Sequence, residues 1–162
     1  MSYIQKNLLE GEHAVYFGKL HWSVFIPAVF YLCIAVACAG VFIRGGDTAM
    51  IAYTFGSLFM LVSFVSFIRA LIRKISTELA VTDKRVIFKE GLISRSTMEL
   101  PHGRIESIRE AQSIPGRILG YGDIILEGTG GGKQFMKQIA RPTTFKKHAQ
   151  SAAIDASQPA TK

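Results

Sequence analysis

The residues that could carry out chemistry are few and scattered along the chain. The histidines and cysteines form no HxxxH, HExxH or CxxC pattern, so no metal-binding spacing is present. The glycine-rich stretch 128–133 does not match a phosphate-binding loop, because Gln134 stands where a Ser or Thr must follow the lysine. No serine or threonine lies in a nucleophile motif. We therefore expect no catalytic residue, no metal site and no cofactor, and we predict that the protein is not an enzyme.

Basic side chains are the remaining candidates, and they are unevenly distributed. Of the 162 residues, 49% are apolar and 19% charged, and the net charge of +7 lies entirely after Ile68. A basic half beside an apolar half is typical of proteins that meet anionic membranes or nucleic acids. Interleaved acidic residues and the lack of an aromatic stacking platform argue against nucleic acid. The candidate contacts for anionic phospholipid headgroups are Arg69, Arg73, Lys74, Lys84, Arg85 and Lys89. The alternative is the ordinary bias toward positive charge on the cytoplasmic side of a membrane.

Two stretches without any charged residue precede this basic half. Residues 23–43 and 48–68 are each 21 residues long, and a helix of that length spans about 31 Å, close to a hydrocarbon core of about 30 Å. We expect two transmembrane helices joined by an external turn at 44–47. Gly56 and Ser63 lie seven positions apart on one face and are the candidates for close helix packing. The alternative is that these small residues have no packing role.

The charges at the helix ends predict the orientation. Basic residues follow the second apolar stretch, whereas the turn offers only Arg44, so both termini should be cytoplasmic. The expected location is the cytoplasmic membrane, with residues 1–22 as a cytoplasmic segment. No ionisable group lies inside either stretch, which argues against a channel or proton pathway.

From residue 75 to 156 the pattern becomes that of a small α+β module. Short segments rich in Ile, Val, Phe and Thr alternate with turn residues, and helical spacing begins after Pro142. Such strands predict a curved antiparallel sheet or a small barrel that a helix can close. The expected strands are 77–81, 85–89, 95–100, 105–111, 123–127 and 134–139, with a helical turn at 117–120, a helix at 142–156 and a flexible tail at 157–162.

Several motifs of this module, in order, resemble one family. They are Leu79–Ile87 (LAVTDKRVI), Gly91–Arg95 (GLISR), Arg104–Ile108 (RIESI), Arg117–Gly122 (RILGYG) and Arg141–Phe145 (RPTTF). Together with the two apolar stretches they resemble the two-transmembrane-helix, membrane-anchored members of the bacterial pleckstrin-homology-like domain family. The resemblance implies an antiparallel β-barrel capped by the C-terminal helix, and no catalytic residues. Such barrels usually have seven strands and the module shows six, so we expect 13–20 to be an additional strand.

The function expected from these features is that of a membrane-anchored, non-enzymatic binding or scaffold module. The helical hairpin would hold the barrel at the cytoplasmic face, where it binds an unknown protein partner or further copies of itself. The alternative is an anionic-lipid sensor or lipid-handling protein that uses the basic residues after the second helix. A lipid bilayer is a partner under both hypotheses, and nucleic acid under neither.

Overall fold

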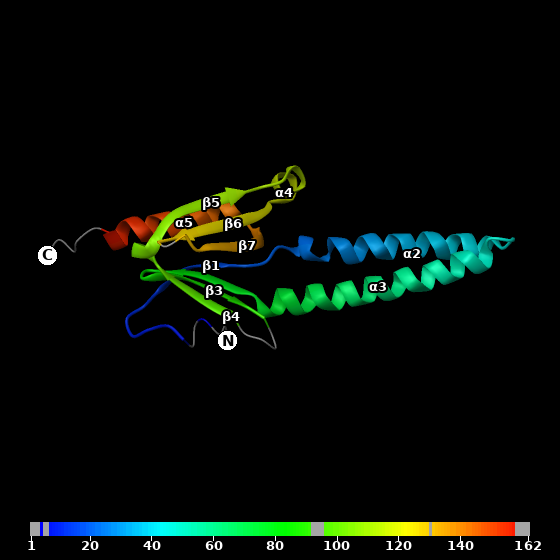
Figure 1. Cartoon of the computed structure of the whole chain (residues 1–162), viewed down its shortest axis with the longest axis horizontal. Helices are drawn as coiled ribbons and strands as arrows, with labels where there is room; N and C mark the ends of the chain where they lie inside the picture. The colour runs from blue at the N-terminus through cyan, green and yellow to red at the C-terminus, as the bar shows by residue number, and fades with distance from the viewer. Residues whose placement is uncertain (1–3, 5–6, 92–95, 130, 158–162) are drawn as a thin grey trace. The chain divides into compact units, whose positions relative to one another are not determined.

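A computed structural model describes residues 4, 7–91, 96–129 and 131–157 (Figure 1). The remaining positions, among them Arg95 and most of the predicted tail, lie outside the described residues. The chain forms two compact units. Met1–His21 and Ile75–Lys162 make up the first, the sheet unit, and Trp22–Lys74 make up the second, the helical unit. The helical unit is therefore an insertion in the sequence of the sheet unit.

The helical unit contains the two apolar helices predicted from the sequence. They are antiparallel because the connection between them is only a few residues long (Figure 1). Gly45 and Gly46 reverse the chain there with φ of 74° and 98°, a conformation that glycine adopts at little cost because it has no Cβ. The elements are the 3-10 turn η1 (Trp22–Phe25) and the helices α2 (Ile26–Arg44) and α3 (Ala49–Ser76).

The second helix is longer than predicted. It continues from the expected end at Ile68 to Ser76, so the predicted headgroup contacts Arg69, Arg73 and Lys74 lie on the helix itself. The residues of this extension are mostly good helix formers, and cations in the last turn are stabilised by the negative end of the helix dipole.

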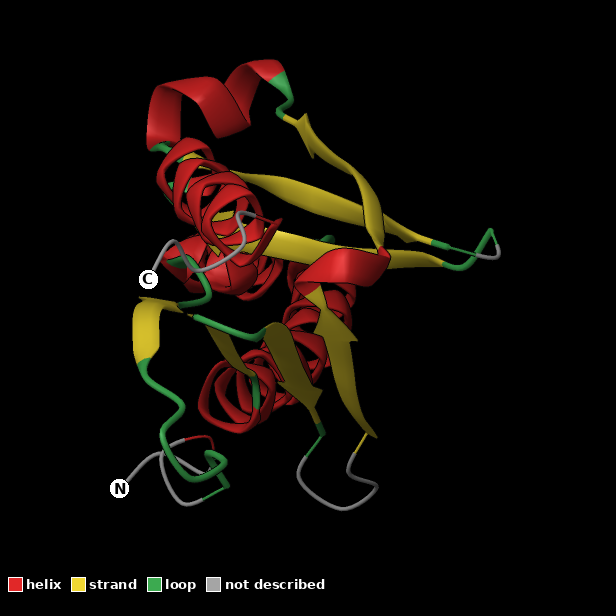
Figure 2. Cartoon of the chain, turned by 90° about the vertical axis from the view of Figure 1, so that its left-hand side faces the viewer, coloured by secondary structure: helices red, strands yellow, loops and turns green. Residues whose placement is uncertain are grey.

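The sheet unit contains two antiparallel sheets, shown in Figure 2. The first has the strand order β1-β2-β3-β4 and the second β5-β6-β7. Within the described residues six strands follow α3, which is the number expected from the sequence. The strands are β1 (Ala14–Gly18), β2 (Glu78–Thr82), β3 (Arg85–Glu90), β4 (Ser96–Pro101), β5 (Ile105–Ala111), β6 (Tyr121–Gly128) and β7 (Lys133–Ala140); the helical elements are η2 (His102–Arg104), α4 (Ile114–Leu119) and α5 (Pro142–Ser157).

The segment expected to add a strand does so. β1 pairs antiparallel with β2, with Gly18 opposite Leu79. The chain then continues beside β7: Leu20 forms a bridge with Ile139, and the backbone N–H of Ala140 donates to the carbonyl oxygen of Lys19 at 2.9 Å. Residues before the helical unit therefore connect the two sheets.

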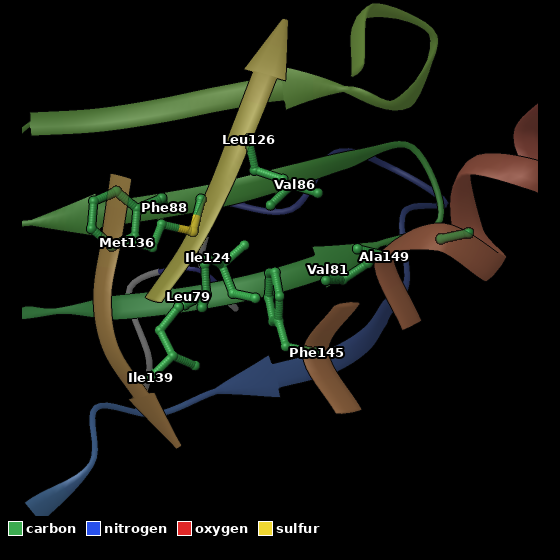
Figure 3. Close-up of a cluster of buried hydrophobic side chains, with 11 residues drawn as sticks. Leu79, Val81, Val86, Phe88, Ile124, Leu126, Met136, Ile139, Phe145 and Ala149 are labelled. Carbon is green, nitrogen blue, oxygen red and sulfur yellow. The ribbon is translucent and has the colours of Figure 1, made fainter. Parts of the chain in front are cut away.

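The main core lies between the two sheets and α5 (Figure 3). β6 alternates between half-buried and buried residues, so one of its faces is directed into the core. Phe145 and Ala149 of α5 are fully buried and point toward the strands (Figure 3). The buried members of this core are Leu79, Val81, Val86, Phe88, Ile124, Leu126, Met136, Ile139, Phe145, Ala149 and Ala152.

Two details differ from the expectation. The predicted closed barrel is not formed, because no pairing joins β4 to β5 within the described residues and η2 turns the chain between them. The helical turn expected at 117–120 is α4, which begins at Ile114 because the Ser113 hydroxyl accepts a hydrogen bond from the N–H of Gly116 at 3.2 Å.

Candidate functional site

The predicted headgroup contact Arg85 is held inside the sheet unit by two carboxylates. Its Nε and Nη2 donate to the two oxygens of Glu12 at 3.0 and 2.7 Å, and its Nη1 donates to Glu99 Oε2 at 2.6 Å. The side chain of Glu12 is fully buried, whereas that of Glu99 is 45% exposed. The charge of Arg85 is thus compensated within the protein, and the residue fastens the N-terminal segment to β3.

Glu12 accepts further hydrogen bonds at this fastening. The N–H of Leu9 donates to it at 2.8 Å and the hydroxyl of Thr82 at 2.7 Å. Burial raises the pKa of the Glu12 carboxyl, but the hydrogen bonds from Leu9, Thr82 and Arg85 and the charge of Arg85 together lower it below its usual value. Glu12 is therefore charged at neutral pH, as the Arg85 guanidinium requires.

The segment before β1 also covers the outer face of the first sheet. Ile4 is buried against Ala80 and Ile87, with Leu8 packed beside them. The N–H of Ile4 donates to Glu78 Oε2 at 3.1 Å. This contact is not among those predicted from the sequence, but the apolar run in β2 is a signal for it, because a strand that is apolar on both faces is covered on both.

The basic residues of the sheet unit lie at opposite ends of its strands. One end of the sheet unit is formed by Lys19–His21 and Ser76–Glu78, where the chain passes to and from the helical unit; we call it the helix-linked end. Lys89 lies at this end, opposite Glu78 in the ladder. Lys84 lies in the turn at the other end of β2, a five-residue strand, hence about 16 Å away. Lys84 and Lys89 are therefore separated by more than a Debye length of about 8 Å.

The other three predicted headgroup contacts lie on the last turns of α3. Arg69 and Lys74 are exposed and Arg73 is half-buried. The ammonium group of Lys74 lies 5.3 Å from the centre of the Phe25 ring, a cation–π distance. Three of the six predicted contacts thus belong to the helical unit, and the three in the sheet unit are separated, with Lys89 at the helix-linked end and Lys84 and Arg85 at the other end of β3.

The residues predicted to pack the helices lie where α2 and α3 meet. The hydroxyl of Ser63 donates to the carbonyl oxygen of Ala28 at 2.8 Å. A Cβ added at Gly56 would lie 3.2 Å from the Cβ of Cys38, so the glycine allows the helices to approach closely. Ring pairs extend the contact along the hairpin, namely Phe25–Phe67, Tyr31–Phe59 and Phe42–Tyr53.

Each sheet has an outer strand with an unpaired edge. Within the described part of the chain β4 pairs only with β3, and β5 only with β6. Charged side chains protect an edge against pairing with another chain. β5 carries Glu106, Arg109 and Glu110, whereas β4 carries one charged residue, Glu99, which is bound to Arg85. The edge of β4 is therefore the more open to a partner strand.

A family model described as Bacterial PH domain matches residues 23–160, which includes both apolar helices and most of the sheet unit. This match confirms the resemblance found in the sequence motifs. No curated protein and no solved structure matched the chain.

Proposed function

We propose that this chain, which belongs to the bacterial PH domain family, is a membrane-anchored, non-enzymatic binding module. Its helical unit crosses the bacterial inner membrane, and its sheet unit presents the edge of β4 to a strand of a protein partner or of a second copy in the cytoplasm. The family supports the binding role in general terms, and the fold described above supports the particular anchoring and the particular edge.

The surface of the helical unit supports the anchoring. α2 has 19 and α3 has 28 residues, which correspond to helices of about 29 and 42 Å, enough to cross a hydrocarbon core of about 30 Å. Their large apolar side chains are mostly exposed, among them Phe30, Ile43 and Phe64. A surface of this kind is unfavourable in water and favourable in lipid.

The observation that carries the proposal is the position of the helices between two paired strands. β1 precedes the helices and β2 follows them, and both lie in one sheet. A sheet cannot form across a membrane, so the two strands are on the same side. It follows that the chain crosses the membrane twice or not at all, and a single crossing is excluded. The excess of basic residues after α3 then favours the cytoplasmic side for the sheet unit.

The orientation is tested by cysteine labelling in intact cells. In a background with Cys33→Ala and Cys38→Ala, Gly46→Cys at the helix turn should react with a membrane-impermeant maleimide added outside. Thr129→Cys in the sheet unit should react only after the membrane is permeabilised. Reaction of Thr129→Cys in intact cells would contradict the proposed orientation. Labelling of the denatured protein is the control, which shows that both thiols are present and reactive.

The edge of β4 is tested by a photocrosslinking amino acid at Thr97 in the full-length protein in its native membrane. We expect an adduct with a strand of a protein partner or of a second copy. The same probe at Lys147, exposed on α5, is the control and should give no such adduct. Adducts with phospholipid alone would favour the alternative function of an anionic-lipid sensor. Equal protein adducts at both positions would show that β4 is not the binding edge.

A further inference from the structure

The short helix α4 exposes apolar side chains to an unusual degree. Ile114 is 82% and Ile118 79% exposed, more than any other large apolar residue that the structure describes in the sheet unit. Leu119 beside them is also exposed. Scattered apolar residues on a surface are ordinary, but two isoleucines presented together on one helical turn indicate a contact surface.

These side chains point outward because the other side of α4 is fixed against the sheet. Gly116 is buried, and a Cβ added there would lie 2.7 Å from the carbonyl oxygen of Tyr121. Ser113 caps the start of the helix, and Gly120 ends it with φ of 78°, in the left-handed region. The isoleucines are therefore held outward by a rigid local structure.

α4 lies at the helix-linked end of the sheet unit. Tyr121, which packs under α4, stacks on His21 with ring centres 5.3 Å apart. His21 is the last residue before η1, and its N–H donates to the carbonyl oxygen of Gln138 at 2.8 Å. The isoleucines are thus carried by the part of the sheet unit from which the chain enters the first apolar helix.

The charges around α4 fit an anionic lipid surface. No acidic residue occurs from Ala111 to Gly122, and Arg117 is exposed on α4 between the two isoleucines. Lys19 and Arg141 add exposed cations at the same end. The N–H of Arg141 donates to the carbonyl oxygen of Gly120 at 3.0 Å, and the carbonyl oxygen of Lys19 accepts a hydrogen bond from the N–H of Ala140. The two flanking acids are half-buried and fewer than the three cations: Glu110 accepts a hydrogen bond from the Thr143 hydroxyl, and Asp123 accepts one from the N–H of Gln138.

We propose that α4 is a second membrane contact, in which Ile114 and Ile118 enter the interfacial layer of the bilayer and Arg117 faces the lipid phosphates. This inference rests on the proposed anchoring by α2 and α3. An apolar turn flanked by cations is the composition of an interfacial anchor. With the chain entry at His21, this contact gives the sheet unit a second point of attachment and restricts its rotation above the membrane.

The experiment measures the depth of three sites in the same vesicles. The full-length chain, with Cys33→Ala and Cys38→Ala, carries an environment-sensitive fluorophore at Ile118→Cys, Tyr53→Cys or Thr129→Cys. It is reconstituted in vesicles of phosphatidylethanolamine and phosphatidylglycerol that contain lipids with a nitroxide quencher near the headgroup or deep in the acyl chain. Tyr53 is an exposed residue of α3, and Thr129 is exposed in the loop between β6 and β7, at the end of these strands opposite the helix-linked end.

We expect the label at position 118 to be quenched by the shallow nitroxide more than by the deep one. The label at 53 should be quenched, and the label at 129 should be quenched by neither lipid. Quenching at 53 but not at 118 would overturn the inference and leave the anchoring intact, whereas no quenching at 53 would overturn the anchoring itself. A label at 118 that is blue-shifted but not quenched would show that protein, such as a second copy, covers α4, and would also overturn the inference.

A charge variant separates contact from mere proximity. Ile114→Glu should reduce the shallow quenching of the label at 118, because a carboxylate opposes insertion beside anionic lipid. Phe135→Glu is the matched control, since Phe135 is exposed on β7 toward the end opposite the helix-linked end, and it should leave the quenching unchanged. Both side chains are more than half exposed, so neither change removes core packing. Equal quenching with and without Ile114→Glu would contradict the insertion.

Discussion

The buried pair between Glu12 and Arg85 is the contact whose loss should most weaken the attachment of the N-terminal segment. Glu12→Gln keeps the size of the side chain and removes its charge. The guanidinium of Arg85 then faces an amide group in a buried site, where one of the two hydrogen bonds from Arg85 must be lost. Glu99 remains as its second acceptor.

The size of the effect follows from burial. Removing one partner of a buried ion pair costs about 3–5 kcal/mol. The side chain of Arg85 is 13% exposed and that of Glu12 fully buried, and because Glu99 still compensates part of the charge we take the lower value, about 3 kcal/mol. If the segment opens locally rather than with global unfolding, the amides of β1 should exchange with solvent about 150-fold faster in the variant.

Hydrogen exchange followed by mass spectrometry of the full-length protein in lipid nanodiscs measures this directly. Peptides that cover residues 7–18 should lose protection, whereas those from β6 and β7 should keep it. Glu99→Gln is the control, because Glu99 is 45% exposed and exposed pairs contribute at most about 1 kcal/mol, or roughly fivefold in exchange. Equal changes in the two variants, or a loss of protection spread over both sheets, would refute the assignment of Glu12 as the local fastening.

Three further predictions test the pH dependence, the glycine packing and the helix contact. Because the pKa of Glu12 is lowered in the folded protein, the stability that its carboxylate contributes should be complete above the ordinary pKa of 4.5. This contribution should be lost as the pH falls through the lowered pKa, and hydrogen exchange of the β1 amides measured against pH will show the loss. Gly122→Ala should destabilise the sheet unit by about 1–3 kcal/mol in thermal unfolding, since the nearest side-chain atom would be 2.6 Å from the new Cβ, whereas Gly103→Ala meets no atom within 4 Å and should be neutral. Ser63→Ala removes the 2.8 Å hydrogen bond to Ala28, and should weaken helix association in bicelles by about 0.6 kcal/mol.

Each of these predictions has an outcome that contradicts it. If the protection of β1 falls as steeply with pH in Glu12→Gln as in the parent protein, another group causes the loss of protection at low pH. Equal melting temperatures for the two alanine variants would show that the strand at Gly122 relaxes without cost. A hairpin stabilised by Ser63→Ala would show that the hydroxyl opposes helix association.

The regular elements could be predicted because their signals are local in the sequence. The absence of charge over two stretches indicates the helices directly, and the turn residues on either side predict β5 at Ile105–Ala111 with both boundaries. The end of α3 was harder to predict, since Arg69, Arg73 and Lys74 change the polarity of the chain without interrupting its helical propensity. Polarity and secondary structure are separate properties, and only the first changes at Ile68.

The fastening and the surface of α4 could not be predicted, because both depend on tertiary neighbours. The charge of Arg85 is visible in the sequence, but its partner Glu12 is 73 positions away, and without the β1–β2 register nothing brings them together. For Ile114 and Ile118, the sequence predicts burial where the structure has exposure. Isoleucines in a short helical turn are expected to face a core, and it is the close packing of Gly116 on Tyr121 that turns them outward.

The insertion of the helices between β1 and β2 also explains why the fastening is needed. β1 is synthesised before the helices, but its partner β2 emerges only after both, so this pairing closes a long loop and is a slow, non-local step. The strand is only five residues long, is an outer strand of its sheet and has a register shift between Ala14 and Tyr16. Its backbone pairing alone is thus a weak attachment. Two side-chain contacts add to it: Tyr16 stacks on His148 of α5 with ring centres 4.7 Å apart, and Glu12 binds Arg85 of β3 at 2.7 Å. These contacts hold the residues that precede the first helix to the rest of the sheet unit.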